Sequence, residues 1–246
     1  MNKEVLAIIP ARSGSKAINN KNIMDICGFP LLAYSIATAK MSKRINRVIV
    51  STNSDEYAKI AKRFGAEVPF LRPEGISKDS SLDTEFLYHT LNTLIENENY
   101  RPDIVALLRP TTPIRKPQYV DEAIDLLIKN DNNTAVVSST VAKDCPYKWM
   151  ILDNGFLVSP FEGMKPDDVG LPRQSFPEVL IPDGYVDVLR NTVILNEKLA
   201  YGNRAIPYYT PEEAVDIDTT EDVNRVKNMK IEGLDIYRWL QTEKLE

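Results

Sequence analysis

The chain has 246 residues, of which 43 % are hydrophobic and 26 % charged, and its formal net charge is −5. This is the composition of an ordinary globular protein that is long enough to bury a full core without disulfide or metal staples. The acidic balance argues against broad nucleic-acid binding, which needs a basic face. A single histidine, His89, excludes a histidine-rich zinc site and leaves a Ser-His-Asp triad only if His89 itself serves.

Membrane and export signals are also missing from the sequence. The apolar runs are shorter than the roughly 18 residues that span a bilayer, and the first residues lack a signal peptide. Cys27 and Cys145 lie far apart and form no Cys-x-x-Cys pattern, so reduced thiols are the expected state. We therefore expect a cytoplasmic protein with no membrane partner.

Strand-like and helix-like segments alternate over the first 140 residues or so. Continuous apolar runs such as Val5–Ile9 are typical of strands buried on both faces, and their alternation with helices predicts an α/β fold with an open, mainly parallel, doubly wound sheet. The predicted strands are Val5–Ile9, Arg47–Ser51, Glu67–Phe70, Asp103–Leu108 and Thr134–Thr140. The predicted helices are Leu31–Lys40, Asp55–Phe64, Leu82–Glu96, Gln118–Lys129, Thr219–Met229 and Leu234–Leu240.

The alternation stops after about residue 141. Proline, glycine and aromatic residues are frequent from 144 to 184, which predicts a partly irregular, β-rich insertion at about 141–190 within a single domain spanning 1–246. Insertions this long are usually functional or lie against something else. A partner subunit is one candidate, because exposed aromatic residues need cover.

The loop after the first predicted strand concentrates positive charge. It carries Arg12, Lys16 and Lys21, and no acidic residue occurs between Val5 and Met24. The carboxyl ends of strands are where open α/β sheets place ligands, and small residues let backbone N–H groups join the cations. The segment is interpreted either as a phosphate cradle for a nucleotide or as a solvated turn with scattered cations.

Three further loops follow predicted strands. Ser51–Ser54 contains a polar cluster that caps the next helix or faces a ligand. Arg72 is a candidate phosphate ligand, and Ser80 or Ser81 can cap the following helix and turn its amides towards an anion. Leu107–Arg115 places two threonines between prolines, which makes a stiff loop suited to reading a base edge or serving only as a rigid turn.

A pair of carboxylates lies near the C-terminus. Asp216 and Asp218 are two residues apart, so an extended segment presents both on one face, about 6–7 Å apart. Mg²⁺ takes one or two carboxylates and completes its shell with phosphate and water. The alternative is that Asp218 or Thr219 caps the last long helix and Asp216 is merely exposed. His89 lies inside a predicted helix and is interpreted as a structural histidine.

Several ordered motifs resemble the acylneuraminate cytidylyltransferases, the CMP-sialic acid synthetases with their legionaminate and pseudaminate relatives. The likeness spans nearly the whole chain. It rests on Ile9–Lys16 with Lys21 and Asn22, on Ser51–Ser54, Arg72–Pro73, Leu108–Pro113, Pro172–Gln174 and Asp216–Thr219. The resemblance implies a Rossmann-like nucleotidyltransferase sheet of the nucleotide-diphospho-sugar transferase type. It also implies a homodimer whose dimerisation arm is the insertion.

The resemblance implies an activity and a role for each matched residue. A nine-carbon, sialic-acid-like 2-keto sugar acid would be joined to CMP. The reaction would consume CTP, require Mg²⁺ and release pyrophosphate. Catalysis is expected from Arg12, Lys16, Lys21 and Asp218. Nucleotide binding is expected from Ala11, Arg12, Lys16, Lys21, Asn22, Arg72, Ser81, Arg109, Pro110 and Thr111. Sugar binding is expected from Lys148, Arg173, Gln174, Tyr185 and Asp187, and Lys148 and Arg173, with Gln174, would meet the sugar acid and its carboxylate. Metal ligation is expected from Asp216 and Asp218.

Three positions depart from the family pattern. Ala17 replaces a glycine after the loop lysine, and Arg109 replaces a glutamine that is frequent in the fourth loop. Asp187 stands where an aromatic residue is expected to touch the sugar. These departures bear on base reading and on the choice of sugar acid.

Two alternative functions remain open at this stage. A metal-dependent glycosyltransferase also uses an Asp-x-Asp pair, but it would consume a nucleotide sugar and need an acceptor. A non-catalytic nucleotide-sugar binding protein would keep the pocket without needing the metal pair. The Walker A and Gly-x-Gly-x-x-Gly patterns are absent, which argues against a P-loop NTPase and a dinucleotide dehydrogenase.

Overall fold

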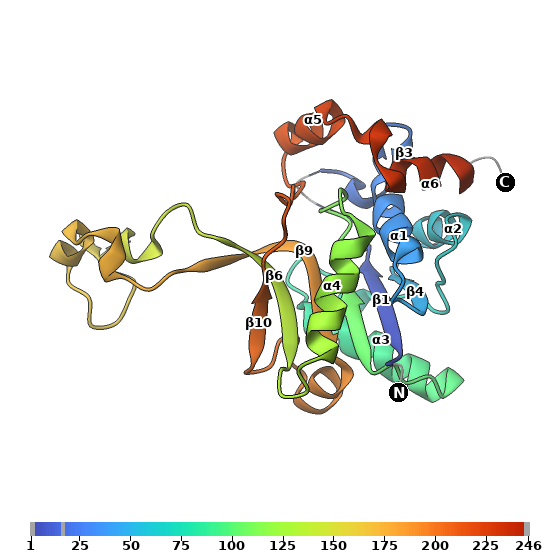
Figure 1. Ribbon diagram of the computed structural model, residues 1–246, viewed down its shortest axis with the longest axis horizontal. Coiled ribbons are helices and arrows are strands. Elements are labelled where there is room, and N and C mark those ends of the chain that lie inside the picture. Colours follow the sequence, from blue (N-terminus) through green and yellow to red (C-terminus); the bar gives the residue numbers. More distant parts are fainter. Residues whose placement is uncertain (1–2, 16–17, 244–246) are drawn as a thin grey trace. The chain divides into compact units, whose positions relative to one another are not determined.

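The computed structural model describes residues 3–15 and 18–243. The chain forms two compact units (Figure 1), which are described separately below. The first consists of Met1–Ser138 and Asp183–Glu246, and the second of Ser139–Pro182. Residues 183–190, which were assigned to the insertion from the sequence, belong to the first unit.

A six-stranded sheet organises the first unit. Its strand order is β10-β6-β9-β5-β1-β4. β1 pairs in parallel with β4 and with β5, β10 pairs in parallel with β6, and β9 runs antiparallel to β5. The predicted α/β class and mainly parallel sheet are confirmed. The strands are β1 (Val5–Pro10), β4 (Arg47–Ser51), β5 (Ile104–Leu107), β6 (Ala135–Val141), β9 (Leu180–Arg190) and β10 (Ala205–Tyr208).

Both faces of the sheet are buried under helices. Because successive side chains along a strand point to opposite sides, each strand contributes to both buried faces. In β1, Ala7 and Ile9 pack in one apolar cluster, whereas Leu6 and Ile8 pack in another. α1, α2, α4, α5 and α6 contribute to the first cluster, and α3 contributes to the second. The helices are α1 (Leu31–Met41), α2 (Asp55–Arg63), α3 (Asp83–Glu98), α4 (Pro117–Ile128), α5 (Thr220–Asn228) and α6 (Asp235–Glu243).

Local capping explains where two helices begin. The Ser54 hydroxyl accepts a hydrogen bond from the Tyr57 N–H at the start of α2. At the start of α5, the Thr219 hydroxyl accepts from the Asp222 N–H, and the Asp222 carboxylate accepts from the Thr219 N–H. These reciprocal bonds satisfy amides that have no partner inside the helix. The predicted cap at Ser54 is therefore confirmed, and Thr219 caps α5 as the alternative interpretation of the Asp216–Thr219 segment expects.

The predicted strand Glu67–Phe70 is wrong. Only a single bridge pairs Glu67 with Ile49. In this bridge the Glu67 N–H donates to Val48 O, and the Glu67 carbonyl accepts from the Val50 N–H. Pro69 follows two residues later and has no N–H to continue a ladder. The short hairpin of β2 (Asp25–Ile26) and β3 (Phe29–Pro30), and strand β10, are absent from the predicted elements.

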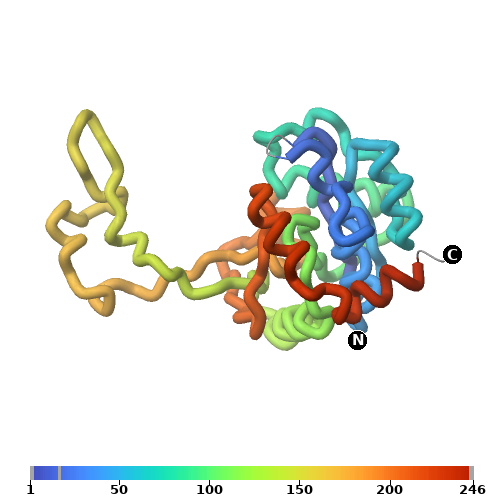
Figure 2. Tube along the Cα trace, turned by 90° about the horizontal axis from the view of Figure 1, so that it is seen from above, coloured from blue at the N-terminus to red at the C-terminus, as the bar shows by residue number. Residues whose placement is uncertain are grey.

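The second unit, Ser139–Pro182, has little regular structure. It contains a hairpin of β7 (Ile151–Asp153) and β8 (Phe156–Val158), with short 3-10 turns elsewhere. Tyr147 stacks on Phe176 with ring centroids 5.5 Å apart. In Figure 2 the trace leaves the first unit through β6 and returns to it through β9. The insertion is thus less β-rich than the sequence predicts, because its prolines interrupt backbone pairing.

Within the described ranges, none of the helices combines the length and the hydropathy that a bilayer crossing requires.

Candidate functional site

A cavity of about 250 Å³ opens where β1 and β5 end. Carboxyl ends of parallel strands meet at one edge of a sheet, which is why loops distant in sequence share this space. Cationic side chains dominate its polar lining. The lining residues are Pro10, Arg12, Ser15, Lys21, Asn22, Arg72, Lys78, Ser81, Asp83, Phe86, Arg109, Pro110 and Thr111.

The loop after β1 is held in shape by its neighbours. The Ala11 N–H donates to Ser51 O at 2.9 Å, and Ala11 is buried. The Ser13 N–H donates to Asn53 Oδ1 at 2.9 Å, and Asn22 Nδ2 donates to Arg12 O at 3.0 Å. The polar loop after β4 therefore both supports this loop and caps a helix. Lys16, predicted to bind phosphate, lies outside the described residues.

Two cations of this loop have acidic partners from remote segments. Arg12 Nη2 lies 2.6 Å from Asp79 Oδ1, and Lys21 Nζ lies 2.9 Å from Asp218 Oδ1. Lys21 Nζ also donates to the carbonyl of Ile217 at 2.7 Å. The lack of a local counter-charge in the sequence is thus compensated in the fold. The Lys21 contact places the predicted metal ligand beside the predicted phosphate loop.

Arg72 forms part of the cavity wall although it is only 5 % exposed. Its Nε donates to Ser51 Oγ and its Nη2 to Ser51 O, and its guanidinium lies over the Phe86 ring. Burial lowers the pKa of Arg72 to about 10; Asp83 opposes that shift and Arg12 adds to it. The side chain therefore stays cationic at neutral pH and is held rigidly for an anion.

Ser81 lines the cavity, but it does not cap the following helix. α3 begins at Asp83, and the Leu82 N–H donates to Glu85 Oε2 at 2.7 Å. The Ser81 hydroxyl instead accepts from the Lys78 N–H at 3.1 Å. The predicted capping by Ser80 or Ser81 is wrong, because the Glu85 carboxylate satisfies the helix terminus.

The loop after β5 is fixed by a buried arginine beneath it. Arg115, 2 % exposed, donates from Nη1 to Ser35 Oγ and from Nη2 to Arg109 O and Gly184 O. Its Nε donates to Tyr185 O. Burial lowers the pKa of Arg115 to about 10. Pro110 and Thr111 line the cavity above this anchor, and the Thr111 carbonyl accepts from the Ile217 N–H.

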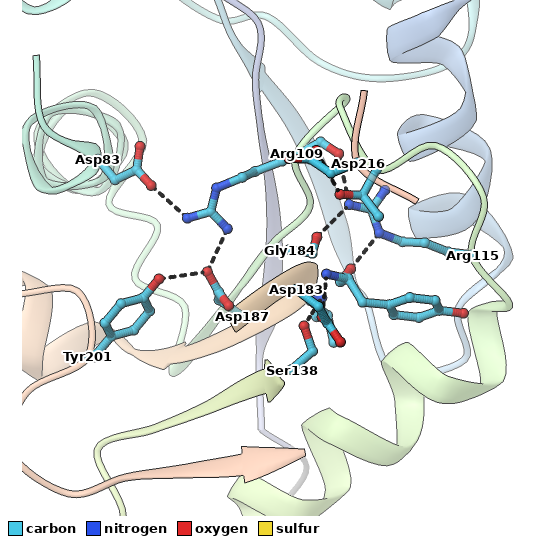
Figure 3. A network of polar contacts seen from close by, with 12 residues as sticks. Asp83, Arg109, Arg115, Ser138, Asp183, Gly184, Asp187, Tyr201 and Asp216 are labelled. Atoms are coloured by element: carbon cyan, nitrogen blue, oxygen red, sulfur yellow. Dashed lines mark hydrogen bonds and ion pairs between the residues drawn. The ribbon is translucent and has the colours of Figure 1, made fainter. Parts of the chain in front are cut away.

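Arg109 lies between two carboxylates (Figure 3). Its Nη2 is 2.7 Å from Asp83 Oδ2, and its Nη1 is 2.6 Å from Asp187 Oδ2. The Tyr201 hydroxyl donates to the same oxygen of Asp187 at 3.1 Å. Burial opposes the charged guanidinium, but Asp187 and Asp83 outweigh it and raise the pKa of Arg109 above its ordinary value.

Asp216 and Asp218 flank the buried Ile217 and are both exposed. Thr112 Oγ1 donates to Asp216 Oδ1 at 3.3 Å. Within the described part of the chain, no three histidine, cysteine or acidic residues cluster closely enough to hold a metal ion. Neither carboxylate lines the cavity, but Asp218 contacts Lys21 of the predicted phosphate loop. Two exposed carboxylates fit Mg²⁺, which takes few protein ligands and completes its shell with phosphate oxygens and water.

The predicted sugar-binding residues fall into two groups. Tyr185 and Asp187 are buried in the first unit, and the Tyr185 hydroxyl accepts from the Lys116 N–H. Neither side chain lines the cavity. Lys148, Arg173 and Gln174 belong to the second unit, where Arg173 donates to the Ala142 and Lys143 carbonyls. The sugar-binding roles of all five stay predictions.

Some contributors to this site carry no signal that sequence reasoning can use. Asp79 and Asp83 look like ordinary acidic residues at a helix start, and Tyr201 lies in an irregular segment. Their partners are identified only by the fold. His89 packs edge-on against Phe70 outside the cavity lining, and burial lowers its pKa. These contacts agree with the structural role expected for His89.

A sequence model described as Cytidylyltransferase matches residues 6–149. The chain is 34 % identical over 223 residues to the N-acylneuraminate cytidylyltransferase of Escherichia coli O18:K1:H7, covering 90 % of this chain and 51 % of that protein. It is 38 % identical over 125 residues to the CMP-N,N'-diacetyllegionaminic acid synthase of Legionella pneumophila, and this match covers 50 % of this chain and 52 % of that protein. The chain spans about half the length of these curated relatives.

Solved structures share the fold at low sequence identity. A CMP:2-keto-3-deoxy-manno-octonic acid synthetase complexed with CTP aligns with a TM-score of 0.67 at 16 % identity, covering 94 % of this chain and 100 % of that chain. The 4-diphosphocytidyl-2C-methyl-D-erythritol synthase of Anaerococcus prevotii aligns with a TM-score of 0.61 at 14 % identity, covering 92 % and 95 %. The architecture is therefore shared beyond the sequence relatives.

Proposed function

The chain belongs to the cytidylyltransferase family, and from that premise we propose that it joins CMP from CTP to an acidic, sialic-acid-like nine-carbon 2-keto sugar. The observation that carries the proposal is the convergence of Arg12, Lys21 and Arg72 on one cavity beside Asp218. Three cationic side chains around one cavity suit the negative charge of a triphosphate. The names of the sequence relatives support CTP and a sugar acid as the substrates.

The proposed reaction is attack by the sugar's anomeric hydroxyl on the α-phosphorus of CTP. A bond forms between the hydroxyl oxygen and the α-phosphorus, and the hydroxyl proton is released to solvent. The bond between the α-phosphorus and the oxygen that bridges to the β-phosphate breaks, and pyrophosphate leaves with that oxygen. Arg12 and Lys21 stabilise the charge that develops on the phosphates, and Arg72 helps to seat the nucleotide. Positioning and charge neutralisation supply most of the rate in such transfers. Asn22, Ser81, Pro110 and Thr111 line the same cavity, in line with the nucleotide-binding roles expected for them, whereas Ala11 is buried and does not line it.

Mg²⁺ would be held by Asp216 and Asp218 and would neutralise phosphate oxygens. The Lys21 ammonium already contacts Asp218. Lys21 would therefore bind phosphate oxygens directly, and Asp218 would bind them through Mg²⁺.

One assay tests the function. The protein is incubated with CTP, Mg²⁺ and, separately, N-acetylneuraminic, legionaminic, pseudaminic and 3-deoxy-octulosonic acids, and pyrophosphate is measured. Release that depends on one nine-carbon acid is the expected result. In a separate incubation with a CMP-sugar and an acceptor, transfer of the sugar without pyrophosphate release would instead indicate a glycosyltransferase. Binding of nucleotide with no turnover of any acid would indicate a sensor.

Replacing Asp218 with asparagine is expected to weaken the response to Mg²⁺. The substitution keeps the side-chain volume but removes a hard anionic ligand, so half-maximal activity should need about tenfold more Mg²⁺. The control is Asp235→Asn, because Asp235 is also an exposed aspartate paired with a cation, Arg238. An unchanged Mg²⁺ titration for the Asp218 variant would count against metal ligation.

The homodimer is also part of this proposal. Exposed apolar side chains on the β7–β8 hairpin support it, with Leu152 75 % and Phe156 73 % exposed. Ile151 and Leu157 extend the same exposed apolar hairpin. A second copy is the proposed occupant because the family resemblance implies a homodimer with this insertion as its arm.

The variant Leu152→Asp/Phe156→Asp is expected to sediment as a monomer, because charges in an apolar interface must be desolvated. Sedimentation velocity compares it with Asp167→Lys, which changes charge at an exposed position of the same unit. A wild-type protein that is already monomeric, or a double variant that remains dimeric, would contradict this interface.

A further inference from the structure

The two carboxylates that hold Arg109 differ in their access to water. The Asp187 side chain is 1 % exposed, whereas that of Asp83 is 45 % exposed and lines the cavity. Arg109 itself is 26 % exposed, so its guanidinium bridges the buried sheet and the open cavity. One partner is therefore fixed in the interior, and the other can exchange with solvent or ligand.

Asp187 is committed to Arg109 by its position. It lies on β9 opposite Leu107 of β5, next to the point at which the Arg109 loop begins. One oxygen accepts from both Arg109 and Tyr201, while Oδ1 is buried with no hydrogen-bond partner among the described residues. A buried carboxylate needs a paired charge. Arg109 is the cation in contact with it, so this contact is expected to persist when ligands bind.

Asp83 has no such commitment. It is the first residue of α3, and an exposed ion pair between charged side chains contributes little stability. Nη2 of Arg109 donates to Asp83, which lines the cavity, and Nε of Arg109 donates to none of the described residues. An incoming carboxylate can take the place of Asp83 on this edge of the guanidinium.

We propose that Asp187 is a positioning residue that fixes Arg109 as a receptor for the carboxylate of the acidic substrate, with Asp83 occupying that place until the substrate arrives. The inference rests on the proposed function, and it replaces the expectation from the family resemblance that Lys148 and Arg173 meet this carboxylate. Guanidinium groups suit carboxylates because their donors form a planar fork. Asp187 thus acts on the substrate only through Arg109, although it does not line the cavity itself.

The triphosphate has its own cations in the same cavity. Arg12 and Lys21 belong to the loop after β1 and pair with Asp79 and Asp218, not with the acids around Arg109. The separate pairing leaves Arg109 for a second oxyanion. Whether that oxyanion comes from the sugar acid or from CTP is decided by measuring the two substrates separately.

The kinetic test uses Asp187→Asn, which keeps the shape but removes the charge, and Asp83→Asn. The acid of the panel with the highest turnover is the varied probe, with CTP varied in a second series. Asp187→Asn should raise the KM for the acid about 10- to 100-fold, the range of a lost hydrogen bond to a charged group, and leave the KM for CTP within about threefold. Asp83→Asn should lower the KM for the acid about two- to fivefold.

Opposite shifts at the two aspartates are the readout that a merely structural role would not produce. Asp55→Asn is the matched control for Asp83, because Asp55 is likewise the first residue of a helix, α2, and lies outside the cavity lining. A KM for CTP that rises as much as that for the acid in Asp187→Asn would assign Arg109 to the triphosphate and overturn the proposal. A raised KM for the acid in Asp83→Asn would also overturn it.

A second readout does not depend on turnover. In arginine-labelled protein, the Arg109 side-chain NMR signals are identified by their loss in Arg109→Lys. Slow rotation about the Nε–Cζ bond is expected in the wild type and in Asp83→Asn, and fast rotation in Asp187→Asn. Equally slow rotation in all three would refute positioning by Asp187. If no acid releases pyrophosphate, the proposed function fails, and this signal still decides the role of Asp187.

Discussion

Replacing Arg12 with alanine is expected to lower turnover by about 10²–10³-fold, the loss typical of one preorganised donor to a charged transition state. Arg12 lines the cavity on the loop after β1, and its side chain is 30 % exposed, so it is open to a ligand. The measurement is the initial rate of pyrophosphate release with CTP and the preferred acid at saturating concentrations.

The loss must be separated from breakage of the Arg12–Asp79 ion pair. Asp79→Asn breaks the same pair at 2.6 Å but keeps the guanidinium. Because an exposed pair contributes little stability, this control should retain turnover within about threefold. Near-normal turnover in a folded Arg12→Ala protein, or an equal loss in both variants, would contradict the direct role of Arg12.

Replacing Arg115 with methionine is expected to destabilise the protein by about 3 kcal/mol or more. The substitution deprives the carbonyls of Tyr185, Gly184 and Arg109 of a buried donor, and each unsatisfied buried acceptor costs about 1–3 kcal/mol. Removing a desolvated charge offsets part of this cost, as the lowered pKa of Arg115 indicates. The free energy of unfolding from urea titration is the measurement.

Two further variants define the origin of that loss. Arg115→Lys keeps the charge but cannot reach acceptors on both sides of a planar fork, so it should be no more stable than the methionine variant. Arg190→Met also removes an arginine that donates to three backbone carbonyls, those of Asn133, Leu127 and Asn130, but nearer the surface, so it should lose less stability. Full stability in Arg115→Lys would show that charge, not the hydrogen-bond geometry, holds the loop.

Local patterns predict those parts of the fold that are decided locally. The apolar run of β1 and the caps at Ser54 and Thr219 follow from side-chain period and from helix-end hydrogen bonding. The segment around Glu67 has strand composition, but Pro69 stops the pairing after one bridge. Composition also says little about the order in which strands assemble, so the antiparallel β9 was not predicted.

The candidate site shows the same division. Its cationic loop is visible in the sequence because Arg12 and Lys21 are close to each other along the chain. The acidic partners of these cations are not visible in the sequence, since Asp79 lies 67 residues from Arg12 and Asp218 lies 197 residues from Lys21. Asp187 illustrates the limit most clearly, because its departure from the family pattern is visible in the sequence. Its pairing with Arg109 becomes visible only in the folded chain.

The central claim is that the loop after β1 and the Asp216–Asp218 segment grip one triphosphate. A crystal structure of the protein with CTP and Mg²⁺ tests it most directly. The account predicts phosphate oxygens within hydrogen-bonding distance of Arg12 and Lys21, with the metal on Asp216 or Asp218. A triphosphate bound at another surface, with these four side chains facing solvent, would contradict it.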